Sequence, residues 1–157
     1  MDWGTLLGTI VGATLGIGST MLADRTRYRR EHATRVHDTL RDLYSSYLAA
    51  LNDSSSTLRI IILRESDATV RYQAALDAFR DASVLTQRYE IALQAPPAVR
   101  EQSDRAYRLL RQWRDLLNTH PDLSLTSPEY LEGLERFHQA RKDLQATMRA
   151  SLLTTET

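Results

Sequence analysis

The sequence predicts an all-α protein, in which one N-terminal transmembrane helix continues into a cytoplasmic, antiparallel bundle of about four helices. Three observations support this prediction. Residues 3–23 carry no charged side chain, apolar residues recur at helical spacing through residues 36–153, and glycine and proline are scarce after Gly18. A β-protein needs more turn residues than this chain has. The alternative is a long coiled-coil hairpin that dimerises.

Composition limits the classes of function. A chain of 157 residues accommodates an anchor and one modest domain. The formal net charge is zero, so no overall field attracts the protein to nucleic acid, and we expect no nucleic-acid partner. The chain has no cysteine, which excludes disulfides, thiolate metal sites and cysteine nucleophiles.

The predicted anchor occupies residues 1–23. Its 21 uncharged residues, Trp3 to Ala23, would rise about 31 Å as a helix, the thickness of a bilayer's hydrocarbon core. A cleaved signal peptide needs a basic segment before the apolar run, and Met1-Asp2 supplies none. Arginines follow the run instead, and such residues stay on the cytoplasmic side. We therefore expect a bacterial inner-membrane protein with its N-terminus outside and its body in the cytoplasm.

Glycine recurs at every fourth position of the anchor. Residues four apart lie on one helix face, and a row of glycines lets two helix backbones approach closely. We expect this helix-packing seam to drive homo-oligomerisation; the alternative is an anchor of small residues with no defined partner. The seam consists of Gly4, Gly8, Gly12 and Gly16.

Residues 24–35 form a predicted basic juxtamembrane stalk. They contain neither glycine nor proline, so the anchor helix is expected to continue through them. Their arginines either bind anionic lipid headgroups or only fix the topology of the anchor. The basic residues closest to the anchor are Arg25, Arg27, Arg29 and Arg30.

Four amphipathic helices are predicted in the body. In residues 36–64 the polar cluster 52–57 is either a loop or a small polar layer within one helix, and we favour the continuous helix. The next helix begins after a turn and N-cap cluster, Glu65-Ser66-Asp67, and ends at Ala95, before two prolines. Its expected buried stripe is Val70, Ala74, Asp77 or Ala78, Leu85, Tyr89 and Leu93, with Leu76 and Phe79 beside it.

The two last helices follow these prolines. Pro97 suits the first turn of the third helix, whose pattern is the clearest: Val99, Ala106, Leu109, Leu110, Trp113, Leu116 and Leu117. Arg108, Arg111 and Arg114 are expected to form a basic ridge on its outer side. The last helix spans residues 127–152, with Thr126 and Glu129 as a capping box, and residues 154–157 are expected to fray. Short connections favour an up-down-up-down bundle, although closure between chains is an open alternative.

No pattern of catalytic residues is found in the sequence. The pair Glu135 and His138 matches the ExxH element of di-iron bundles, but such bundles need two of these elements, so we interpret it as a surface pair. Phosphate-loop, dinucleotide and nucleophile-elbow motifs are absent from the sequence. We therefore expect no catalytic residue, no metal and no cofactor.

The sequence favours a non-enzymatic, single-pass membrane-anchored interaction or scaffold protein. It would self-associate through the glycine seam and present its body to a cytoplasmic protein partner. A small pore-forming or membrane-active protein is the alternative, but a lumen needs a polar stripe, and Thr5, Thr9 and Thr20 lie close to the packing seam. An enzyme whose site has no recognisable motif is a third hypothesis.

Overall fold

The computed structural model describes residues 35, 37–81 and 83–154. These residues form helices and connecting segments without any strand, so the prediction of an all-α bundle is confirmed. Within these ranges no helix is both long and apolar enough to cross a bilayer. The predicted anchor and almost all of the stalk lie outside the described residues, as do the glycine seam and the four juxtamembrane arginines. The compact unit considered below begins at Thr39.

The first helix of the body is described from residue 37 to residue 64 and is continuous. The polar cluster 52–57 does not interrupt it, because Ser54 is small enough to be completely buried at the helix interface. The predicted stripe is buried on either side of this layer, from Leu40 to Ile62. Ile60 and Leu63 are 46% and 67% exposed, so the apolar run at the end of this helix is buried on one side only.

Residues 67–95 form two helices where the sequence predicts one. Helix α2 spans Ala68–Asp81 and α3 spans Val84–Gln94. Ser83 lies between them with φ 55° and ψ 15°, a left-handed conformation that ends α2 without a proline or glycine. Asp67 is the N-cap of α2 as predicted, since its Oδ1 accepts hydrogen bonds from the backbone N–H groups of Thr69 and Val70.

The predicted buried stripe of this segment is wrong at four positions, whereas Ala74 and Ala78 pack against the core as predicted. Val70, Leu85, Tyr89 and Leu93 are all exposed, by 50%, 42%, 57% and 85%. The buried face carries Ala75 and Phe79 in α2 and Val84 and Ile91 in α3. Ala95, directly after α3, is buried as well. The segment has apolar residues on two sides, and helical periodicity alone does not show which side meets the core.

Helix α4 spans Pro97–Thr119, with Pro97 in its first turn as predicted. Its expected stripe is buried at Val99, Ala106, Leu110, Trp113 and Leu117. Helix α5 spans Pro128–Thr154, so Ser127, not Thr126, precedes its first residue. The predicted capping box is therefore wrong, and the hydroxyl of Thr126 pairs with that of Ser124 inside the connecting loop.

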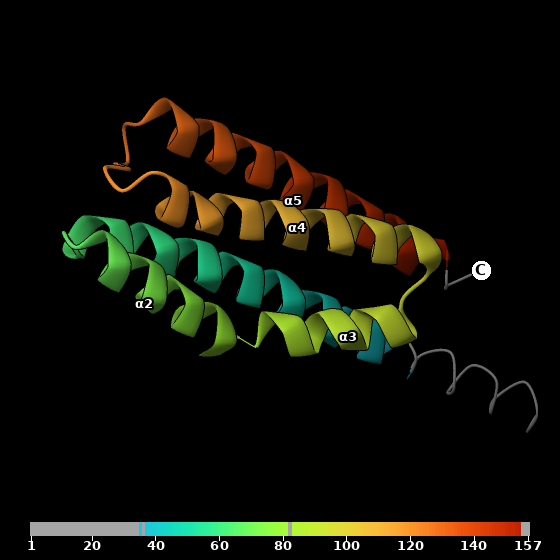
Figure 1. The fold of residues 1–157 in the computed structure, drawn as a ribbon. Helices are drawn as coiled ribbons and strands as arrows, with labels where there is room; N and C mark the ends of the chain where they lie inside the picture. Colours follow the sequence, from blue (N-terminus) through green and yellow to red (C-terminus); the bar gives the residue numbers. More distant parts are fainter. Residues whose placement is uncertain (1–34, 36, 82, 155–157) are drawn as a thin grey trace, which may run out of the picture. The chain divides into compact units, whose positions relative to one another are not determined.

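Side-chain contacts establish the directions of the helices. Tyr44 and Asn52 of the first helix hydrogen-bond to Ser151 and Arg141 of α5, at 3.1 and 3.3 Å, so these two helices are antiparallel. Arg88 of α3 meets Asp104 of α4, and Arg105 of α4 meets Asp143 of α5. These pairs give an up-down-up-down bundle in which α2 and α3 together take the second position (Figure 1). The largest fully buried side chains are Trp113, Tyr47, Phe137, Leu51, Leu58, Ile91, Leu110 and Leu144.

Candidate functional site

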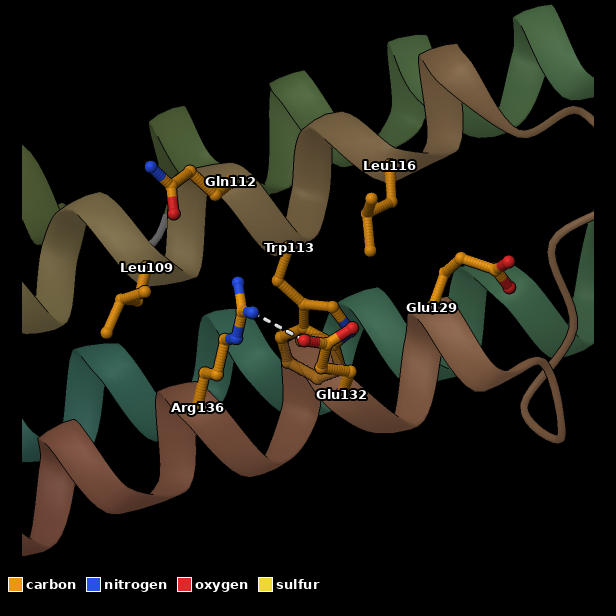
Figure 2. Close-up of a pocket in the computed structure, with 8 residues that line it drawn as sticks. Leu109, Gln112, Trp113, Leu116, Glu129, Glu132 and Arg136 are labelled. Atoms are coloured by element: carbon orange, nitrogen blue, oxygen red, sulfur yellow. Dashed lines mark hydrogen bonds and ion pairs between the residues drawn. The ribbon is translucent and has the colours of Figure 1, made fainter.

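A groove between α4 and α5 is the best-formed concave surface among those found in the described residues. It has a volume of about 160 Å³. Leu109 and Leu116 of α4 point toward α5, Trp113 enters between the two helices, and Glu132 and Arg136 of α5 border the opening (Figure 2). Small-molecule sites usually enclose 300–1,000 Å³. The groove is thus smaller than a typical small-molecule site.

Gly133 makes the groove possible. A Cβ atom at this position would lie 2.5 Å from Cδ1 of Trp113 and 3.3 Å from Cδ1 of Leu116. Trp113 is held from the other side, because its ring lies 5.3 Å from that of Tyr130 and 6.0 Å from that of Phe137, centroid to centroid. The absence of a side chain at Gly133 therefore lets α5 approach α4 closely while leaving a hollow beside the indole.

Arginines adjoin the groove, whose own lining also includes Glu129 and Glu132. A shallow extension of about 490 Å³ adjoins it and is lined by Arg105, Arg108, Leu109, Gln112, Arg136 and Gln139. Arg105 pairs with Asp143 at 3.5 Å, and Arg136 pairs with Glu132. Arg108 has no ion pair with any carboxylate in the part of the chain that the structure describes. The surface around Arg108 therefore favours an acidic group on a partner.

The predicted ridge of Arg108, Arg111 and Arg114 is wrong in its third member. Arg114 is only 8% exposed, and its guanidinium lies 4.9 Å from the centre of the Phe79 ring of α2. Its Nε and Nη2 donate hydrogen bonds to Oδ1 of Asp115 at 2.8 and 2.6 Å. Arg114 thus joins α4 to α2, whereas Arg108 and Arg111 remain exposed.

A polar cluster in the interior connects three helices. The Tyr47 hydroxyl of the first helix donates to the backbone oxygen of Ser103 in α4 at 3.2 Å. Burial raises the pKa of Tyr47 to about 12. Nearby, Nε of Arg88 in α3 donates to Asp104 at 2.7 Å. Burial lowers the pKa of Arg88. The hydrogen bond to Asp104 and the negative charge of Asp104 outweigh this effect, so the pKa of Arg88 is raised. Each of these two donors has an acceptor on α4, so the two bonds hold the first helix and α3 against α4.

Arg71 of α2 holds the loop between α4 and α5. Its guanidinium is 7% exposed and donates to the backbone oxygens of Leu123 and Pro121 at 2.7 and 2.9 Å, with a longer contact of 3.4 Å to Ser66. A buried arginine bonded to carbonyl oxygens was not expected from the sequence, because arginine is rarely buried. Its role is to fix the end of the bundle opposite the Pro96 corner.

The described residues show no group of three metal-ligating side chains. The pair Glu135 and His138 stays a surface pair: burial lowers the pKa of His138, the charge of Arg141 lowers it further, and Glu135 offsets this only in part.

Comparison of the chain with protein-family models, with curated proteins and with solved structures gives no match. The fold and its surface therefore define only a class of protein, a helical bundle with a narrow groove between α4 and α5. The function has to be inferred from the chain itself.

Proposed function

We propose that the protein is a non-enzymatic, membrane-anchored interaction protein that self-associates through its glycine seam. The observation that carries the proposal is the uncharged segment Trp3–Ala23 with glycine at every fourth position, directly followed by arginines. The helical body is consistent with a scaffold, because its polar clusters join helices and its groove fits side chains. The proposed location is a bacterial inner membrane, with the body on the cytoplasmic side.

The groove between α4 and α5 is the surface we propose for the protein partner. A helix of the partner would place an apolar side chain between Leu109 and Leu116 and an acidic residue near Arg108, a helix-in-groove arrangement. Replacing Gly133 would fill this groove, and replacing Arg108 by glutamate would reverse its charge. Affinity capture from mild-detergent extracts with wild-type and Arg108→Glu protein would identify a partner that depends on the groove.

Self-association can be tested with engineered cysteines, because the chain has none of its own. A single cysteine at Thr5, close to the glycine face, should form a disulfide-linked dimer in oxidised membranes. The double substitution Gly8→Leu and Gly12→Leu should abolish this dimer, because leucine separates the two backbones. Thr14→Leu places a leucine on the other side of the helix and should leave the dimer intact. Equal crosslinking in all three proteins would refute the seam.

Topology can be tested with the same approach. A single cysteine at Leu63, which is 67% exposed, should react with a membrane-impermeant maleimide only after the cells are permeabilised. Reaction in intact cells would contradict a cytoplasmic body. Solute flux through vesicles that contain the purified protein would favour the pore-forming alternative.

A further inference from the structure

Helix α3 has a second apolar face that nothing in the described chain covers. Leu85, Tyr89 and Leu93 follow one another at intervals of four residues and are 42%, 57% and 85% exposed. The opposite face of the same helix carries the buried residues Val84 and Ile91. A helix that borders solvent normally has a polar outer face, so an apolar outer face indicates a contact with another molecule.

The residues of this face are uncharged, although the exposed Glu90 borders it and the guanidinium of Arg88 lies 6.0 Å from the centre of the Tyr89 ring. Between its three large residues lie Thr86 and Ala92, which are small, uncharged and exposed. The nearest cation, Arg88, is turned to Asp104 at 2.7 Å and is already paired. We name this surface, formed by Leu85, Thr86, Tyr89, Ala92 and Leu93, the α3 stripe.

We propose that the α3 stripe packs against the α3 stripe of a second copy of this chain. In a two-fold symmetric contact each surface meets itself, so a charged surface would repel its own copy. The α3 stripe has no charge and avoids this penalty. Its spacing of four residues also lets two parallel helices place like residues opposite each other.

The size of the α3 stripe fits a contact within an already tethered dimer. An aromatic residue buries at least ~150 Å², and two of these three side chains are leucines of which Leu85 is only 42% exposed, so together they contribute less than about 450 Å². A stable interface between free proteins buries roughly 800 Å² on each partner. Two bodies joined through their anchors meet at an effective concentration on the order of millimolar, at which a weak contact forms. The inference therefore rests on the proposed self-association of the anchors.

Disulfide crosslinking in oxidised membranes tests the contact. A single cysteine at Leu93 should crosslink several-fold more than one at Leu153, which is 69% exposed but lies on α5. Leu93 and Leu153 are each the last residue but one of their helices, and the ends of α3 and α5 lie at the same end of the bundle, so the comparison isolates the helix face (Figure 1). Adding Tyr89→Glu should suppress the Leu93 crosslink, because it places two like charges opposite each other, and should not affect the crosslink at Thr5.

The outcomes separate the two proposals. If Thr5 crosslinks but Leu93 reacts no more than Leu153, the α3 contact is refuted and the glycine seam stands. If Thr5 does not crosslink, the proposed self-association fails and the α3 contact fails with it. A Leu93 crosslink that survives Tyr89→Glu would refute packing of this face, because the crosslink would then reflect random collision.

Discussion

Gly133 allows the sharpest test of the groove, because two effects of the substitution Gly133→Ala oppose each other. In a helix interior alanine is more favourable than glycine by about 1 kcal/mol, so helix propensity alone predicts stabilisation. The new Cβ would however lie 2.5 Å from Cδ1 of Trp113, and ordinary carbon contacts are about 1 Å longer. The indole is 2% exposed and has little room to move between Tyr130 and Phe137.

We expect the steric effect to prevail. Overpacking of this kind costs about 1–3 kcal/mol. After the gain in propensity is subtracted, Gly133→Ala should lower the free energy of unfolding by up to about 2 kcal/mol. Urea denaturation of the full chain in mild detergent, followed by far-UV circular dichroism, measures this change as a lower midpoint with an unchanged slope.

Glu135 provides the matched control on the same helix. It is exposed, so the difference in stability between Glu135→Gly and Glu135→Ala reports helix propensity without packing. If Gly133→Ala stabilises the protein by as much as this difference, the close approach of α5 to Trp113 does not exist, and the groove described above is wrong.

Three further predictions concern stability and can be measured by the same denaturation experiment. Arg71→Ala should destabilise the protein by about 2–4 kcal/mol, because several buried loop carbonyls lose a charged donor; an effect below 1 kcal/mol would contradict the buried geometry. Ser83→Gly should stabilise it by about 1 kcal/mol, since glycine adopts φ 55° without strain, whereas Ser83→Ala should not. The pKa of Tyr47 is about 12 in the folded protein and 10 in the unfolded chain, so stability should fall by about 2 kcal/mol as pH rises from 10 to 12. Tyr47→Phe should remove that part of the pH dependence, and an unchanged curve would show that Tyr47 is accessible to solvent.

The sequence predicted the fold correctly where a helix has a single apolar face. In α4 the residues Val99, Ala106, Leu110 and Trp113 fall on a single stripe opposite charged residues, and all four are buried as expected. Proline also marks the start of α4 at Pro97. The apolar stripe and the proline are both local features of the sequence, so they can be interpreted without knowing which helices lie next to α4.

Tertiary contacts decide the remaining features. The break at Ser83 has no proline or glycine to announce it, and the two apolar sides of α3 are equivalent until α4 covers one of them. The burial of Arg71 and Arg114 depends on loop carbonyls and an aromatic ring supplied by distant residues. The groove was missed for the same reason, because Gly133 is significant only beside Trp113.

The hydrogen bond from Tyr47 to Ser103 has a consequence for how the helices align along their length. Helices rich in leucine and alanine can slide past each other by one turn, about 5.4 Å, and still bury similar apolar area. After such a slip the Tyr47 hydroxyl would lose its acceptor in the interior, which costs about 1–3 kcal/mol. One bond between two helices thus raises the free energy of every slipped packing and selects a single longitudinal alignment of the bundle.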